Sequence, residues 1–355
     1  TLFSHRIKSA IATGSWIGEK KGVTQNMDKT NYMSIISQLQ KVSSSLSGEQ
    51  TNFFARTLHP THYGRFCPVE TPEGTEIGLR KNLAFMAKIS TRLDLDEDQL
   101  VKELEKLGMK KDGEGSDVFF NGIFIGSVEN HKKFTEQVKE KRREQKLPDE
   151  LSIRYDKQID SILILGDTGR VLRPLIIVKN GKPLLENSHI DALKDGSLTW
   201  KGLLEQGIIE YIDASEEENC LVTITKDKLS PEHTHLEIDK IAFLGPITSL
   251  VSFGNHDQSS RLIRGSKTQK QGLGLYAANY LCRVDTDVSL LHYPQQPIVR
   301  SFIYDTLEVY PAGQNIVVAI MPYEGYNMED SIVLNKASVD KGMGRSTYFR
   351  PYSTV

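Results

Sequence analysis

The stretch HPTHYGRFCPVETPEGTEIGL, residues 59–79, restricts the structure of this chain more than any other segment. Its three prolines and three glycines limit the backbone to few conformations, which suits a loop that must hold a position beside a ligand. His59, His62 and Glu70 also carry side chains that bind metals. Because Pro60 separates the histidines, they cannot lie one helical turn apart as in a metalloprotease motif, so a rigid hydrogen-bonded loop is favoured over a metal site.

The composition indicates a soluble globular protein of two or three domains. The 355 residues include 44 basic and 46 acidic side chains, so contact with nucleic acid would require local patches of charge. The three cysteines form no CxxC pair, which argues against a zinc site and fits a reducing, cytoplasmic location. No apolar run reaches the roughly 20 residues that span a bilayer. Both ends of the sequence suggest a piece of a longer chain.

Three compositional zones predict a mixed α/β (α+β), multidomain fold. In residues 1–89, a helix is expected from Asn31 to about Leu46, followed by a loop at residues 47–50. In residues 90–248, the pattern predicts a helix after residues 94–97, a hairpin turning at Asn121-Gly122, a charged helix over 131–146, strands at 161–167 and 171–178, and a short helix over 198–207. This zone carries no catalytic motif and is interpreted as scaffold.

The third zone, residues 249–355, carries most of the candidate chemistry. It is expected to contain a polar loop over 252–271, an apolar helix over 273–282 and a buried strand over 315–321. In SFGNHDQSSRLIRGSKTQKQGLG, residues 252–274, basic side chains alternate with small polar ones, and glycines would let backbone amides approach a ligand. Either a phosphate-binding loop or an ordinary polar surface loop would have this composition.

Adjacent carboxylates follow the predicted strand, at Glu329 and Asp330 in MPYEGYNMEDSIVLNKASVDKGMGRS, residues 321–346. Hard oxygen donors of this kind suit Mg²⁺, which usually keeps water molecules and substrate phosphates among its ligands. Acidic residues are equally typical of a helix N-terminus, where they interact favourably with the helix dipole. The residues alone leave both interpretations open.

Several of these segments together resemble one family. The stretch 59–79 closely matches the fork region in the second-largest (β-type) subunit of multisubunit DNA-directed RNA polymerases, and ATGSWIGEKKGVTQ (12–25) with NYMSIISQLQKVSS (31–44) is similar to the same region. The wording of RTLHPTHYGR, PYEGYNMEDS and NKASVDKGMGRS resembles archaeal versions. The resemblance implies a fork region at 1–89, external domain(s) at 90–248 and the first part of the hybrid-binding domain at 249–355.

The resemblance also implies roles for individual residues. In the family the fork lies beside the RNA–DNA hybrid and the downstream duplex, so Gln25, Lys41 and Arg56 would face nucleic acid; without the family, Lys41 and Arg56 would be taken for solvated surface charges. Lys270 and Gln271 match a pair that approaches the RNA end. Lysine and arginine neutralise phosphates, a contact that positions a strand without reading its sequence.

Arg261, Glu329 and Asp330 are the catalytic candidates that the resemblance implies. Arg261 aligns with an arginine that contacts the phosphates of the incoming nucleotide, whereas Arg264 stays unassigned. GYNMEDS matches GYN-x-EDS, whose acidic pair helps to hold the second, nucleotide-borne Mg²⁺. The first Mg²⁺ is held in the family by aspartates of the largest subunit, so this chain would supply half of a site.

The expected partners are the largest and other polymerase subunits, template DNA, the RNA–DNA hybrid and nucleoside triphosphates, with no membrane. Two functions follow. In the first, the chain helps to catalyse RNA synthesis within the complex. In the second, it only steers nucleic acid and assists subunit assembly. The chain alone is expected to be inactive, because it lacks one metal site and most of the cleft.

Overall fold

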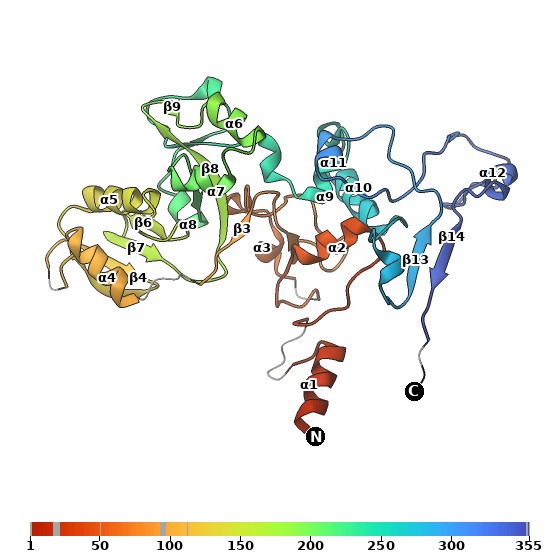
Figure 1. Cartoon of the computed structure of the whole chain (residues 1–355), viewed down its shortest axis with the longest axis horizontal. Coiled ribbons are helices and arrows are strands. Elements are labelled where there is room, and N and C mark those ends of the chain that lie inside the picture. The colour runs from red at the N-terminus through yellow and green to blue at the C-terminus, as the bar shows by residue number, and fades with distance from the viewer. Residues whose placement is uncertain are drawn as a thin grey trace. The chain divides into compact units, whose positions relative to one another are not determined.

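The computed structural model describes residues 2–16, 22–49, 51–92, 97–111, 113–352 and 354 (Figure 1). The chain divides into two compact units. The first unit comprises Thr1–Ala55, Val69–Asn82 and Pro246–Val355, and the second comprises Arg56–Pro68 and Leu83–Gly245. The stretch 59–79 therefore passes from the second unit to the first after Pro68. The domain boundaries expected near residues 89 and 248 stay a prediction.

The second unit is a mixed α+β structure. Its helices are η1 (Pro60–His62), α4 (Glu97–Lys106), α5 (His131–Arg143), α6 (Asn187–Lys194), α7 (Trp200–Glu205), α8 (Ala214–Glu217), η2 (Lys226–Lys228) and η3 (Lys240–Phe243). Its strands are β3 (Lys88–Ile89), β4 (Ser116–Phe120), β5 (Ile123–Val128), β6 (Ser152–Asp156), β7 (Ser161–Leu165), β8 (Val171–Lys179), β9 (Lys182–Pro183), β10 (Ile209–Ile212), β11 (Val222–Thr223) and β12 (His235–Leu236).

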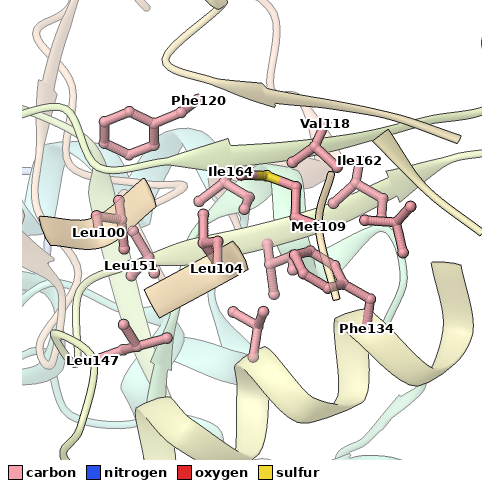
Figure 2. Close-up of a cluster of buried hydrophobic side chains, with 13 residues drawn as sticks. Leu100, Leu104, Met109, Val118, Phe120, Phe134, Leu147, Leu151, Ile162 and Ile164 are labelled. Atoms are coloured by element: carbon pink, nitrogen blue, oxygen red, sulfur yellow. The ribbon is translucent and has the colours of Figure 1, made fainter. Parts of the chain in front are cut away.

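One core of the second unit lies between a four-stranded sheet and two helices. The strand order is β5-β4-β7-β6, with β4 and β7 parallel. Leu100 and Leu104 lie four residues apart on α4 and pack with Phe134 of α5 against Ile162 and Ile164 of β7 (Figure 2). These side chains are at most 1% exposed. The helix predicted after residues 94–97 and the charged helix predicted over 131–146 are thus confirmed in type.

The predicted hairpin and strands of the second unit are also confirmed. Asn121 and Gly122 both have positive φ, 48° and 83°, which matches the tight turn expected between β4 and β5. Strand β8 is buried over most of its length because β10 and β12 pair with it on its two sides, and β11 extends this six-stranded sheet. The short helix predicted over 198–207 appears as α7. Residues 93–96 and Gln50, where a helix start and a loop were expected, lie outside the described residues.

The first unit has more helix than strand. Its elements are α1 (Leu2–Thr13), α2 (Tyr32–Leu39), β1 (Lys41–Ser43), β2 (Arg80–Asn82), α9 (Pro246–Ser249), η4 (Gly254–His256), α10 (Ser259–Gln271), η5 (Tyr280–Cys282), β13 (Val288–Leu291), α11 (Phe302–Thr306), α12 (Lys336–Asp340) and β14 (Ser346–Phe349), and α3 (Phe53–Arg56) crosses the boundary between the units. Two antiparallel pairs, β1-β2 and β13-β14, are its sheets in the described part.

The helix expected from Asn31 to about Leu46 is shorter than predicted. It ends at Leu39, because the next residues form β1 and satisfy their backbone groups by pairing with β2. The apolar side chains predicted to share one face of this helix, Tyr32, Ile35, Ile36 and Leu39, are not its buried ones. Leu39 is 80% exposed, whereas Ser34 and Ser37 are buried. The polar side chains are buried because they find hydrogen-bond partners, as in the 2.7 Å bond from Ser37 Oγ to Glu70 Oε1.

The polar loop expected over 252–271 is wrong for most of its length, because residues 259–271 form α10. Arginine, lysine, glutamine and leucine have good helix propensity, and they outweigh the single Gly265 in its middle. Ser266 faces inward and lies within 3.1 Å of Thr248 Oγ1 on α9. A small polar residue at the contact lets these two helices approach closely.

Two further predictions in the third zone are wrong. Residues 273–282 form an irregular segment that ends in η5, not an apolar helix. A Cβ atom on Gly274 would lie 2.5 Å from Pro311 O. The backbone at Gly274 therefore runs directly against residues 311–312, which leaves no room for the side chains that a helix would project on that side. Residues 315–321 are exposed and unpaired by any described strand, with Ile320 97% exposed. A strand needs a neighbour, and the described residues supply none here.

No helix among the described residues is both long enough and apolar enough to cross a bilayer.

Candidate nucleic-acid interface

The basic side chains of α10 recur every three residues. Each of Arg261, Arg264, Lys267 and Lys270 is a neighbour of the next on the helical surface, but every step of three residues turns by about 60° around the axis, so the four cations form a row that winds around the helix. Helix α10 packs against α9 and α2 in the first unit. The sequence predicted basic residues in a loop, and the helix instead arranges them in a row of positive charge.

A pocket of about 530 Å³ lies beside this row, within the first unit. Four cationic side chains line it, and they come from three separate segments of the sequence. These are Lys41 of β1, Arg80 of β2, and Lys267 and Lys270 of α10. Gln271 and Gln38 are also part of the lining. The structure thus brings together three of the expected nucleic-acid contacts, Lys41, Lys270 and Gln271.

The charges in this pocket affect one another. Loss of hydration lowers the pKa of Lys41, and the nearby positive charges of Arg80 and Lys270 lower it further, although the carboxylates of Asp28 and Glu76 partly offset this. An anion entering the pocket would relieve this repulsion and favour the charged form of Lys41. The pocket is therefore suited to a negatively charged group such as a phosphate.

Glu70 contacts three of the elements that line the pocket. It is 1% exposed, accepts a hydrogen bond from Ser37 Oγ at 2.7 Å and pairs with Lys270 Nζ at 3.1 Å. The side chain of Asn82 donates to the Glu70 carbonyl oxygen at 3.1 Å. The stretch CPVETPEG thereby connects α2, β2 and α10. The sequence marked Glu70 only as a candidate metal ligand and did not indicate this contact.

Residues 59–68, the part of the stretch 59–79 that belongs to the second unit, are anchored there by Arg65. Its guanidinium donates to the carbonyl oxygens of Val171 and Ile212, each at 3.0 Å, and pairs with Glu217 at 2.6 Å. A buried arginine of this kind fixes the backbone around it, because its donors need several acceptors in set positions. The rigid loop predicted for residues 59–79 is confirmed as hydrogen-bonded, although its two halves serve different units.

Gln25 and Arg56 are not among the residues that line the pocket. Gln25 is exposed, and its side chain donates to Gly22 O at 3.0 Å and accepts from Gln38 Nε2 at 3.5 Å. Because Gln38 lines the pocket, Gln25 stands beside it. Arg56 is half-buried at the end of α3 and belongs to the second unit.

The catalytic candidates are not joined to one another in this chain. Arg261 is exposed in the first turn of α10, whereas Glu329 and Asp330 lie in an exposed turn. Among the described residues, no hydrogen bond or ion pair connects Arg261 to either carboxylate, and no group of three or more metal-binding side chains is present. Residues 315–321 form no strand, and the hydrogen bonds of the turn among the described residues are local.

The backbone of this acidic turn has an uncommon conformation. Glu329 and Asp330 both have positive φ, 54° and 66°, a region that non-glycine residues seldom occupy. The Asn327 side chain braces the turn, donating to Met321 O at 2.6 Å and accepting from Tyr323 N at 3.0 Å. Both residues are exposed, so their carboxylates are accessible to a ligand.

The sequence indicates Lys267 only as one of the basic residues of a possible phosphate-binding loop, and it does not single out Arg80 or the acidic partners of these two residues. Arg80 pairs with Glu76 at 2.5 Å, and Lys267 pairs with Glu73 at 3.2 Å. These residues belong to segments almost two hundred positions apart, and only the fold places them together. The three-residue spacing of the α10 cations was the available signal, and it was attributed to a loop.

Four segments of the chain match domains of one large protein. They correspond to RNA polymerase Rpb2 domain 3 at residues 25–89, domain 4 at 118–179, domain 5 at 200–241 and domain 6 at 247–354. The chain belongs to the family of the second-largest subunit of multisubunit RNA polymerases. The resemblance inferred from the fork and GYNMEDS segments is thereby confirmed.

Full-length relatives support the same family. The DNA-directed RNA polymerase subunit Rpo2 of Sulfolobus acidocaldarius is 44% identical over 99% of this chain, which covers 33% of that relative. Rpo2 of Saccharolobus solfataricus is 43% identical, and the DNA-directed RNA polymerase II subunit RPB2 of Encephalitozoon cuniculi is 34% identical. Each match again covers 99% of this chain and 33% of the relative. The chain thus spans about a third of the length of these curated relatives and is similar in sequence to the archaeal subunits.

Proposed function

We propose that this chain acts within a DNA-directed RNA polymerase, where it contacts the RNA–DNA hybrid and contributes to the site of nucleotide addition. The observation that supports this most directly is the pocket in which Lys41, Arg80, Lys267 and Lys270 gather from three segments of sequence. Other polymerase subunits, template DNA and nucleoside triphosphates are the partners that this role requires. A cytoplasmic location remains part of the proposal.

The pocket would bind the sugar–phosphate backbone of the hybrid. Lysine and arginine neutralise phosphates and release condensed counterions, which gives affinity that does not depend on base sequence. Gln271, exposed at the end of α10, adds an amide that can donate to a phosphate or sugar oxygen. A polymerase must hold every sequence that it transcribes, and backbone contacts of this kind meet that need.

Arg261 is proposed to contact the phosphates of the incoming nucleotide. Its planar guanidinium can bind two phosphate oxygens at once and stabilise the charge that builds on the leaving pyrophosphate. It is exposed and has no described ion-pair partner within this chain, so its donors are available to a ligand.

Glu329 and Asp330 fit a partial Mg²⁺ site. They provide hard oxygen donors on two exposed neighbouring residues, but the described residues offer no group of three or more metal-binding side chains here. The remaining ligands would come from the largest subunit and from the triphosphate. When bound, the ion would neutralise charge on the leaving group. The chain alone is therefore expected to show no nucleotidyl transfer, and robust transfer by it in isolation would contradict the proposal.

A second function has one observation in its favour. Among the described residues, no hydrogen bond or ion pair joins Arg261 to Glu329 or Asp330. In this alternative the acidic turn is architectural, and the chain only steers nucleic acid and helps to assemble the subunits.

The substitution Asp330→Ala, made in the assembled polymerase, separates the two functions. We expect the rate of nucleotide addition at low Mg²⁺ to fall on the order of tenfold, because a group that holds the ion directly or through water is lost. Higher Mg²⁺ should restore part of the rate, and subunit assembly should be unchanged. The measurement is single-nucleotide extension of an RNA primer across a Mg²⁺ titration.

The matched control is Asp340→Ala, an identical change at an exposed residue of α12. It should leave the Mg²⁺ dependence unaltered. If Asp330→Ala instead impairs assembly, and the enzyme that does assemble adds nucleotides normally, the acidic turn is architectural and the second function holds.

A further inference from the structure

Glu73 lies between two cations of α10. Its Oε2 atom is 3.2 Å from Lys267 Nζ and 3.5 Å from Arg264 Nη1. Lys267 and Arg264 are three residues apart on the same side of the helix, which is why one carboxylate reaches both. Part of the positive charge on α10 is thus neutralised from within the chain, at the edge of the phosphate-binding pocket proposed above.

This contact differs in kind from the one that Glu70 makes one turn farther along α10. Glu70 is 1% exposed and fixed by Ser37 and Lys270, so it belongs to the permanent packing of the pocket. The side chains of Glu73, Lys267 and Arg264 are 37%, 40% and 59% exposed. Ion pairs with this exposure are weak and exchange readily with other partners.

The backbone that carries Glu73 is held in place. Thr71 Oγ1 accepts from Gly78 N at 2.8 Å and donates to Arg80 O at 3.0 Å, which closes a loop around residues 72–77. Gly74 has a φ of +91°, so the chain turns sharply directly after Glu73. The carboxylate can therefore leave the cations by side-chain rotation alone and return to them without any movement of the loop.

We infer that Glu73 competes with nucleic-acid phosphate for Arg264 and Lys267, two cations at the edge of the pocket, which Lys267 also lines. The inference rests on the proposed function, because it assumes that α10 meets the hybrid. A phosphate that reaches the two cations displaces Glu73 toward solvent. When that phosphate moves on, Glu73 pairs with them again. The exchange limits how tightly the backbone is held, which favours movement of the hybrid past α10.

The test is Glu73→Gln in the assembled polymerase, which removes the charge and keeps the shape. The probe is an RNA–DNA hybrid scaffold of fixed sequence, and the measurement is its dissociation constant over a range of KCl concentrations. We expect binding to become about three- to tenfold tighter, because the phosphate no longer has to displace the Glu73 carboxylate from Arg264 and Lys267. The slope of log affinity against log salt should steepen by roughly one.

Two controls isolate the effect. Glu129→Gln makes the same change of charge in the second unit, where Glu129 pairs with Lys110 on the surface at 2.7 Å, and it should leave hybrid affinity unchanged. In the double background Arg264→Gln and Lys267→Gln, the substitution at Glu73 should give no gain, because the cations that it frees are absent.

Failure of this inference can be told apart from failure of the proposed function. If Lys270→Gln weakens hybrid binding but Glu73→Gln does not strengthen it, α10 meets the hybrid and Glu73 does not compete there. A gain from Glu129→Gln as large as that from Glu73→Gln, or a gain that survives in the double background, also overturns the inference. If neither Lys270→Gln nor Lys41→Gln affects binding, the proposed function itself is wrong.

Discussion

Replacing Arg261 by alanine in the assembled polymerase is expected to lower kcat/KM for nucleotide addition by roughly 100-fold, about 2.7 kcal/mol of transition-state stabilisation. The physical reason is the loss of a guanidinium that binds triphosphate oxygens where negative charge builds up. Arg261→Lys should recover only part of the loss, because an ammonium group keeps the charge but not the two-pronged geometry. The measurement is rapid-quench extension by one nucleotide over a range of nucleotide concentrations.

A second readout distinguishes a nucleotide contact from a structural role. Pyrophosphorolysis, the reverse reaction, should fall with the forward reaction, since both pass through the same transition state. Arg6→Ala on the exposed helix α1 is the matched control and should change neither direction. If Arg261→Ala weakens hybrid binding while nucleotide addition stays normal, Arg261 belongs to the hybrid-contacting surface and the catalytic assignment is wrong.

Replacing Arg142 by methionine is expected to lower the free energy of unfolding of the second unit by about 3–5 kcal/mol. Arg142 is 2% exposed and pairs with Glu216 at 2.6 Å and with Glu210 at 2.7 Å, so it joins α5 to α8 and β10. Methionine fills a similar volume but leaves two buried carboxylates without this partner. Lys141→Met, at the half-exposed neighbouring position, should have an effect below about 0.5 kcal/mol.

The chain offers a direct probe for this measurement. It has two tryptophans, and Trp200 of α7 belongs to the second unit, where its indole donates to the Tyr211 hydroxyl at 3.1 Å. In a Trp16→Phe background, urea denaturation followed by fluorescence therefore reports on the second unit. Equal unfolding free energies for the Arg142→Met and Lys141→Met variants would show that the buried cluster does not stabilise the fold.

The effect of Arg142→Met should also depend on pH. Burial by itself would raise the pKa of Glu210, but the charge of Arg142 and the hydrogen bond from His235 hold that pKa well below its usual range. A carboxyl with a lowered pKa in the folded state stabilises the fold above its ordinary pKa, and this stability is lost as the pH falls. Without Arg142, Glu210 can take up a proton more easily, so the difference between variant and parent should shrink in acid.

The scaffold of the second unit was largely predictable from sequence. Its elements have local signals, such as the positive-φ turn at Asn121-Gly122 and the four-residue spacing of Leu100 and Leu104. These patterns depend on neighbours that are close in sequence, and burial in the unit agrees with them. Predictions in the third zone failed where the deciding contact was distant, as for Gly274 against Pro311 and Ala312.

The candidate site was also only partly predictable from the sequence. The sequence motifs alone were enough to indicate the polymerase family and to single out Lys41, Lys270 and Gln271. The structure places these three residues at one pocket. The sequence could not show that Arg80 and Lys267 complete the lining, or that Glu73 pairs with Lys267 and Arg264. It also predicted a buried strand at 315–321 that has no partner among the described residues.

By itself, the sequence determined the family, the candidate residues and the local elements of the second unit, because these depend on residue types and short spacings. Only the tertiary structure decided which charges meet. Electrostatic interactions act over a few ångströms of space, and residues such as Glu73 and Lys267 come within that range only after the chain has folded.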